Sequence, residues 1–213
     1  MNTSQTDTTF TKEDGAILEE VMNIAFGKAS SELATVVDLR ILLNAPKVEF
    51  LQADDLLRWI KQDTADNDTL NMIEQNFWGK YTGSAFLAFP TSASKGLVSL
   101  FEDDDLPPMD EENPLLVKEN LLEIGNILIG ACVSKVAELL DDEVTFSPPR
   151  LIPRMVVDNL ANEARLDPDK VAILIKTVFH IQDKDIKGFL FLVAGEESMA
   201  WLKTALQNFV AKF

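Results

Sequence analysis

The sequence is poor in the residues on which many catalytic and metal sites depend. Its 213 residues include a single cysteine, Cys132, and a single histidine, His180. One cysteine excludes an intrachain disulfide, and nothing indicates an oxidising compartment. His180 has no second histidine or cysteine cluster near it in sequence, so we expect no metal or catalytic role there. Neither a G-x-G-x-x-G nor a P-loop pattern occurs, so a phosphate-cradling loop is not expected either.

Basic residues and long hydrophobic runs are also scarce. Lys and Arg total 19 against 35 Asp and Glu, which gives a net charge of −16. An acidic surface repels phosphate backbones, so we do not expect a nucleic-acid partner. No apolar stretch reaches the roughly 18 residues of a membrane span. The first ten residues lack the basic start and apolar run of a signal peptide. We therefore expect a soluble, cytoplasmic protein without membrane insertion.

Hydrophobic periodicity predicts the elements of the first half of the chain. Apolar residues at helical spacing predict a helix from about Thr11 to Val37, with Thr11 as its N-terminal cap ahead of Glu13 and Asp14. An extended piece is expected at 45–50 and a helix at 53–62. Two strands, 69–77 and 82–89, are expected to form a hairpin before a helix at 92–101.

The same order of elements then returns. Residues 102–114 form an acidic, proline-bearing connector without periodicity. After it we predict a helix at 115–140, an extended piece at 147–153, a helix at 156–164, hairpin strands at 170–181 and 186–195, and a helix at 197–209. We therefore divide the chain into a flexible N-terminus (1–10) and one domain (11–213). The domain consists of repeat one (11–101), the connector (102–114) and repeat two (115–213).

Direct alignment of the two long helices supports a duplication. The segment EEVMNIAFGKASSELA (19–34) aligns with LEIGNILIGACVSKVA (122–137). This is a long-period duplication rather than a solenoid of short units. It predicts a single α/β (α+β) domain with internal pseudo-two-fold symmetry, in which two long helices flank an antiparallel-rich sheet. The aligned pairs are Glu20 with Glu123, Asn23 with Asn126, Gly27 with Gly130 and Pro46 with Pro149.

On a helical wheel, the aligned polar residues gather on exposed stripes. At about 100° per residue, Glu20, Asn23 and Gly27 share one stripe of the first helix. Glu119, Glu123, Asn126 and Gly130 share one stripe of the second. A carboxylate can pair with a lysine or arginine of another molecule, and an amide can hold a water in a fixed orientation. A glycine inside a helix costs about 1 kcal/mol against alanine, and its benefit would be close approach of another backbone.

These residues are parts for docking onto a partner and positioning a water there, since the stripes contain no nucleophile and no metal-ligand cluster. The alternative is that each stripe is an ordinary solvated helix face, on which exposed polar residues are the norm. Occurrence in both helices can reflect common ancestry rather than use.

The pattern resembles the CheC/CheX/FliY family of chemotaxis phosphatases. That family carries a D/S-x3-E-x2-N motif followed by a proline about 22 residues later. The two-copy form is the arrangement of CheC. The leading position is Ala16 in the first copy and Glu119 in the second, and because Ala16 cannot accept a hydrogen bond, we expect the second site to be the stronger. The copies read Ala16, Glu20, Asn23, Pro46 and Glu119, Glu123, Asn126, Pro149.

The resemblance implies a phosphatase acting on the aspartyl phosphate of a CheY-like response regulator. It implies that Asn23 and Asn126 orient the hydrolytic water and that Glu20 and Glu123 contact the receiver's active-site lysine. No cofactor is expected on this chain, since the Mg²⁺ belongs to the partner receiver. A CheD-like regulator is a further partner that the resemblance leaves open.

Two other interpretations remain at this point. The first is a non-catalytic receiver-binding or scaffold module of the same fold, related to flagellar switch proteins, in which the stripe residues are remnants. The presence of both asparagines favours catalysis over this interpretation. The second is a sensor or ligand-binding domain, which no pocket-forming motif supports.

Overall fold

A computed structural model of the chain describes residues 10–37, 41–43, 47–52, 69–92, 114–155, 171–181 and 184–211, together with single positions between 55 and 60. Among the predictions, the flexible N-terminus, the helices at 92–101 and 156–164, Pro46 and nearly all of the acidic connector lie outside these residues. Within the described residues no helix is long and apolar enough to cross a membrane.

Helix α1 (Lys12–Val37) begins as the sequence predicts. The backbone N–H of Asp14 donates to the Thr11 hydroxyl (3.1 Å), and the backbone N–H of Thr11 donates to the Asp14 carboxylate (2.8 Å). This reciprocal capping box satisfies amide groups that have no partner within the helix. Helix α4 (Pro114–Leu139) starts at the last residue of the predicted connector, and α6 (Glu196–Val210) closes the described chain.

All strand pairs of the eight-stranded sheet are antiparallel. The path runs β1-β7-β8-β4-β3-β5, with β2 paired to β7 and β6 paired to β3. The two predicted hairpins are confirmed as β3–β4 and β7–β8, whereas the short strand β1 was not anticipated. The strands are β1 (Ile41–Leu43), β2 (Lys47–Gln52), β3 (Leu70–Trp78), β4 (Gly83–Pro90), β5 (Thr145–Phe146), β6 (Arg150–Met155), β7 (Val171–Ile181) and β8 (Lys184–Ala194).

The two halves of the chain exchange strands. Strand β2 of the first half pairs with β7 of the second, and β6 of the second half pairs with β3 of the first. One of these contacts is reinforced by an ion pair between Arg150 and Glu74. The exchange joins both halves into one sheet, as expected for one α+β domain. Whether the halves arose by duplication stays a prediction.

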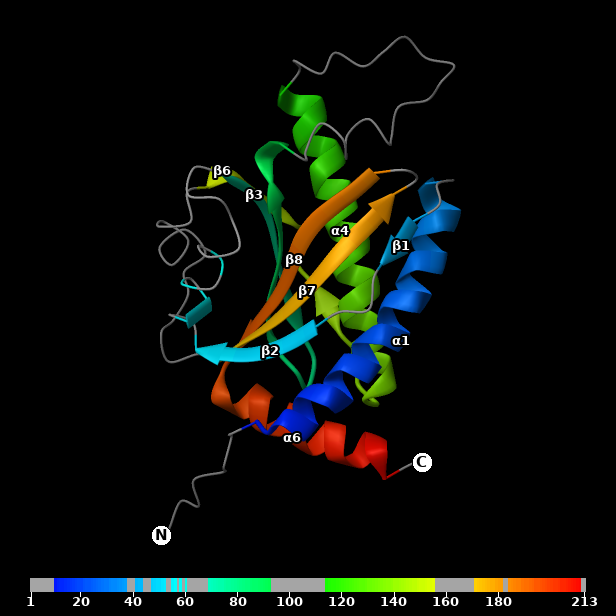
Figure 1. Cartoon of the computed structure of the whole chain (residues 1–213), viewed down its shortest axis with the longest axis vertical. Coiled ribbons are helices and arrows are strands. Elements are labelled where there is room, and N and C mark those ends of the chain that lie inside the picture. The colour runs from blue at the N-terminus through cyan, green and yellow to red at the C-terminus, as the bar shows by residue number, and fades with distance from the viewer. Residues whose placement is uncertain are drawn as a thin grey trace.

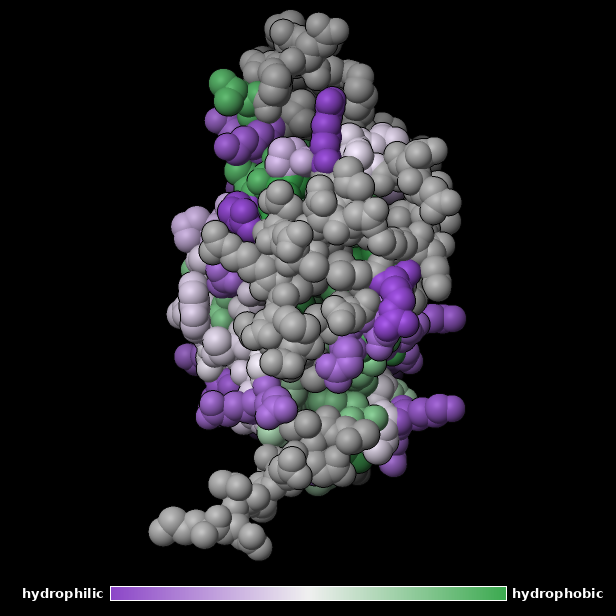
Figure 2. Space-filling model, turned by 90° about the vertical axis from the view of Figure 1, so that its left-hand side faces the viewer, coloured by the Kyte–Doolittle hydropathy of each residue, from purple (hydrophilic) through white to green (hydrophobic). Residues whose placement is uncertain are grey.

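Helices α1, α4 and α6 cover one face of this sheet. In Figure 1, α1 and α4 run in opposite directions along the sheet and α6 crosses below them. Their buried side chains share one hydrophobic cluster with strand residues that include Ile73, Phe77 and Leu192. A second cluster on the other face packs Leu56 and Ile60 onto the sheet. On the side shown in Figure 2, hydrophilic side chains project from the surface, and the hydrophobic surface between them is divided into small areas. The burial stabilises both long helices, so their outer faces are free for other uses.

Candidate functional site

The predicted stripe on α1 faces solvent. Glu20, Asn23 and Gly27 are exposed, and Ala16 at the leading position of the motif is exposed as well. Within the described part of the chain, the side chains of Glu20 and Asn23 make no hydrogen bond or ion pair. They are therefore available to another molecule. The opposite side of the helix anchors it, through the buried residues Leu18, Val21, Met22, Ala25 and Phe26.

The predicted stripe on α4 also faces solvent. Glu119, Glu123 and Asn126 are exposed, and Gly130 is half-buried. The helix is held to the sheet by the apolar side chains between them, Leu121, Ile124, Leu128 and Ile129, all at most 6% exposed. Exposure of both Glu/Asn pairs agrees with the helical wheels. The catalytic and docking roles of these residues stay predictions.

Asn126 differs from Asn23 because its side chain accepts a hydrogen bond from a buried residue of the sheet. Gln75 of β3 donates from Nε2 to Asn126 Oδ1 (2.9 Å). The same Nε2 donates to the backbone carbonyl of Ser147 (2.9 Å). Gln75 is only 2% exposed, so this contact lies beneath the exposed face of Asn126. The buried amide thus connects β3, α4 and the segment that leads to Pro149.

Sequence reasoning missed Gln75. The signal was its position in the strand LNMIEQNFW, where Ile73 and Phe77 on either side at two-residue spacing both face the helix-side core. A polar side chain at such an inward position needs a hydrogen-bond partner. The sequence does not say that the partner is Asn126, which lies 51 residues away.

Pro149 follows a tightly fixed piece of backbone. The Ser147 N–H donates to Asn76 O (2.9 Å), and the Ser147 hydroxyl accepts from the Asn76 N–H (3.0 Å). Pro149 itself is half-buried, two residues further along. The predicted supporting proline therefore lies next to the contact that carries Gln75, not in the exposed stripe.

The corresponding connection of α1 is built differently. Glu19, the neighbour of Glu20, accepts a hydrogen bond from the backbone N–H of Val48 on β2 (3.0 Å). This contact ties α1 to its adjacent strand without involving Asn23. The two Glu/Asn pairs are therefore equally exposed but differently supported.

The glycines of both stripes have open space around them. A Cβ placed at Gly27 or at Gly130 would meet no atom within 4 Å, apart from the helix itself. Packing within the described part of this chain therefore gives no reason for glycine at either position. Close approach of another molecule, the benefit expected from the sequence, remains available.

The two helices are linked at their sides by a small ion-pair group. Lys28 of α1 lies 3.8 Å from the Glu138 carboxylate of α4, and Lys135 donates to the same carboxylate at 3.0 Å. The hydrogen bond from Lys135, its charge and the charge of Lys28 together lower the pKa of Glu138. Because Glu138 is exposed, solvent screens most of this attraction.

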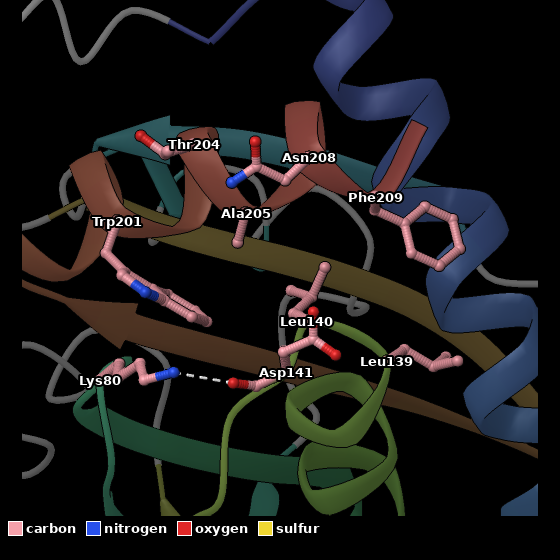
Figure 3. Close-up of a pocket in the computed structure, with 9 residues that line it drawn as sticks. All are labelled: Lys80, Leu139, Leu140, Asp141, Trp201, Thr204, Ala205, Asn208 and Phe209. Carbon is pink, nitrogen blue, oxygen red and sulfur yellow. Dashed lines mark hydrogen bonds between the residues drawn. The ribbon is translucent and has the colours of Figure 1, made fainter. Parts of the chain in front are cut away.

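A concave pocket of about 170 Å³ lies between α6 and the end of α4 (Figure 3). Trp201 lines the pocket, and below it in the view Lys80 donates from Nζ to the backbone carbonyl of Asp141 (2.8 Å). None of the predicted stripe residues lines this pocket. The Lys80 ammonium group therefore binds the turn that follows α4, which is a structural role for a lysine.

Two further reactive groups, Cys132 and Tyr81, are buried. Burial raises the pKa of the Cys132 thiol and that of the Tyr81 hydroxyl above their ordinary values. A neutral buried thiol is a weak nucleophile, so Cys132 is core filler as predicted. Among the described residues, no group of three or more His, Cys, Asp or Glu side chains could hold a metal ion.

Known proteins are similar to this chain in sequence and in fold. The chain is 25% identical to the CheY-P phosphatase CheC of Bacillus subtilis (strain 168) over 201 residues, which span 92% of this chain and 94% of CheC. Its fold is similar to that of Thermotoga maritima FliY, with a TM-score of 0.71, 17% identity and coverage of 96% of this chain and 98% of that chain. A chain of the FliM–SpeE complex from H. pylori gives a TM-score of 0.63 at 12% identity, covering 96% of this chain and 100% of that chain. No protein-family model matches.

The relationship to CheC extends over nearly the full length of both sequences, and the fold agrees independently with FliY. The Glu and Asn residues of the motif that suggested this assignment lie on the two exposed helix stripes. The protein is therefore similar in sequence to CheC and in fold to FliY, two members of the CheC/CheX/FliY family of chemotaxis proteins.

Proposed function

We propose that the protein hydrolyses the aspartyl phosphate of a CheY-like receiver domain. The observation that carries this function is the exposed pair Glu123 and Asn126 on α4, with the Asn126 amide held in place by Gln75. The full-length relationship to CheC, a CheY-P phosphatase, supports it. Glu20 and Asn23 offer a second exposed pair on α1.

In the proposed reaction, a water oxygen attacks the phosphorus and the bond from phosphorus to the aspartyl oxygen breaks. The aspartate leaves as a carboxylate, the phosphoryl group leaves as inorganic phosphate, and the water gives up a proton to the phosphate or to solvent. Such a transfer needs little covalent help from the protein, since positioning and charge neutralisation provide most of the catalysis.

This chain's contribution would be positioning. Asn126 and Asn23 orient the attacking water, because an amide can both donate to it and accept from it. Glu123 and Glu20 bind the receiver's active-site lysine through a charge-assisted hydrogen bond. The receiver holds the Mg²⁺ that neutralises the phosphoryl charge. Gly27 and Gly130 leave room for the receiver backbone beside the pairs.

A receiver-binding or scaffold module is the second candidate, and the similarity in fold to FliY is compatible with it. The same exposed residues could then bind a receiver without accelerating hydrolysis. The two candidates make different predictions for the fate of the phosphate.

The test follows inorganic phosphate released from a phosphorylated CheY-like receiver with Mg²⁺, with and without the protein. Phosphatase activity predicts release faster than that of the receiver alone, proportional to the amount of protein added. Binding of the phosphorylated receiver without faster release would favour the scaffold candidate. Neither binding nor acceleration with any receiver of the same organism would contradict both.

A further inference from the structure

Gln75 is an unusual residue for its place in the fold. It lies on β3 inside the helix-side core, 2% exposed, and its own Oε1 accepts no hydrogen bond within the described structure. Burying a polar atom without a partner costs about 1–3 kcal/mol. An apolar residue of similar length would avoid this cost, so what the Gln75 side chain contributes must come from its Nε2 group.

Resting on the proposed function, we infer that Gln75 is the positioning residue of the α4 site and fixes the Asn126 amide in one of its two orientations. Gln75 touches no part of the bound receiver, since it lies beneath Asn126 in the core. Its effect on the reaction passes entirely through Asn126.

The chain of hydrogen bonds has a fixed polarity. The backbone carbonyl of Ser147 can only accept, so the Gln75 atom that faces it is the donor Nε2. The same Nε2 faces Asn126, so the Asn126 atom below must be the acceptor Oδ1. Turning the Asn126 amide over would place Nδ2 against Nε2, two donors facing each other. The backbone of Ser147 thereby determines which way Asn126 points.

Ser147, whose carbonyl ends this series of hydrogen bonds, is itself held in place. Ser147 is held by two hydrogen bonds to the backbone of Asn76, the residue that follows Gln75 on β3. Neither Gln75 nor Ser147 can therefore shift without breaking the pairing at the edge of β3. The exposed side of Asn126 keeps both Nδ2 hydrogens and one Oδ1 lone pair for a water and a partner.

Among the described residues, the α1 site has no equivalent of Gln75. Within the described residues, the Asn23 side chain makes no hydrogen bond, and the nearby tie between helix and strand runs through Glu19 and Val48 instead. With no described residue to hold it, we expect the Asn23 amide to turn over, so that part of its population presents the wrong atom to the water. A group already held in its reactive orientation has less conformational freedom to lose in the reaction.

The first arm of the test needs no receiver. NMR spectroscopy of the Gln75 side-chain amide should show both hydrogens protected from exchange with water in the unmodified protein. Asn126→Ala should shift the Gln75 amide signal and speed its exchange, while Asn23→Ala should leave it unchanged. A rapidly exchanging Gln75 amide, or one that Asn126→Ala does not alter, would overturn the inference whether or not the protein is a phosphatase.

The second arm measures phosphate release in an Asn23→Ala background, so that the measured release comes from the α4 site alone. Gln75→Met keeps the length of the side chain and removes the donor. We expect kcat to fall tenfold to a hundredfold with KM within about twofold, as when a group that orients a reacting residue is lost. An unchanged kcat in a protein that does hydrolyse the phosphate would overturn the inference and leave the proposed function intact.

A matched control separates positioning from general destabilisation. Asn71 is also buried on β3, where it accepts from the backbone N–H of Arg154 of β6 (3.0 Å). Asn71→Leu should lower the free energy of unfolding without the selective loss in kcat. Equal kcat losses for Asn71→Leu and Gln75→Met would assign the Gln75 effect to stability and contradict the inference.

Discussion

Gly125 of α4 lies directly against Ile73 of β3, so close that a Cβ at Gly125 would be 2.6 Å from Ile73 Cγ2. Real Cβ atoms do not come so near a neighbouring carbon. The helix that carries Asn126 therefore rests on the sheet at a position where only glycine fits. One residue away, Asn126 takes its hydrogen bond from the same strand.

The first prediction concerns this contact. Gly125→Ala should lower the free energy of unfolding by about 1–3 kcal/mol, because an added methyl group in a packed core forces the surroundings to move. Gly130→Ala is the matched control, since it changes the same residue type in the same helix where no atom lies within 4 Å. It should raise the stability by up to about 1 kcal/mol, the helix preference of alanine over glycine. Urea denaturation measures both, and equal effects would contradict the packing assigned to Gly125.

The second prediction concerns the binding of the receiver. If the space at Gly130 admits a partner backbone, Gly130→Ala should weaken receiver binding several-fold even though it stabilises the fold. Gln207→Ala, at an exposed position of α6, is a control that should leave the affinity unchanged. Titration calorimetry with the phosphorylated receiver measures the two affinities. Unaltered binding by the Gly130 variant would remove close approach as the reason for this glycine.

The third prediction concerns the start of α1. Thr11→Ala should destabilise the protein by about 0.5–2 kcal/mol, because the hydroxyl that accepts from the Asp14 N–H is lost. Thr11→Ser keeps the hydroxyl and should cost only a fraction of that amount. Thermal unfolding of the two variants gives the comparison, and similar losses would show that the side-chain methyl group matters more than the cap.

The fourth prediction concerns pH. The pKa of Glu138 is lowered from its ordinary value of 4.5, chiefly by the hydrogen bond from Lys135. A lowered folded-state pKa contributes stability above the unfolded-state value, and this contribution disappears as the pH falls through the folded-state pKa. Glu138→Gln should therefore be less stable than the unmodified protein near neutral pH, and the difference should vanish in acid.

The Glu138 effect should be small and should shrink with added salt, because the carboxylate is exposed. Glu143→Gln, at an exposed acidic position outside the helices, serves as a control for the change in net charge. Chemical denaturation at several pH values provides the measurement. A Glu138 difference that grew toward low pH would show that the assigned direction of the shift is wrong.

Periodicity and capping chemistry were sufficient to predict much of the fold. The helices α1, α4 and α6 and both hairpins follow from local patterns, because each element needs one buried face and a recognisable start. The exposure of Asn23 and Asn126 follows from the same wheels. The strand β1 was missed because three residues are too few to show an alternation.

The pairings that support the site could not be predicted in the same way. Gln75 and Asn126 are 51 residues apart, and they meet because α4 of the second half packs against β3 of the first. The helical wheel separates Gly130 from Gly125, but it does not show that Gly125 lies against Ile73 or that Gly130 faces open space. These contacts depend on where α4 lies on the sheet. The Gln75–Asn126 hydrogen bond separates the α4 site from the α1 site more clearly than their sequence motifs do.

The most direct test compares phosphate release by the unmodified protein with that of Asn23→Ala, Asn126→Ala and the double variant. Asn126→Ala should lose most of the acceleration, on the order of a hundredfold, as when a group that stabilises a transition state is removed. Asn23→Ala should lose less, and the double variant should release phosphate no faster than the receiver alone. Asn208→Ala, an exposed amide on α6, should retain full activity. Full acceleration by the double variant would contradict the assignment of the helix amides as the water-orienting groups.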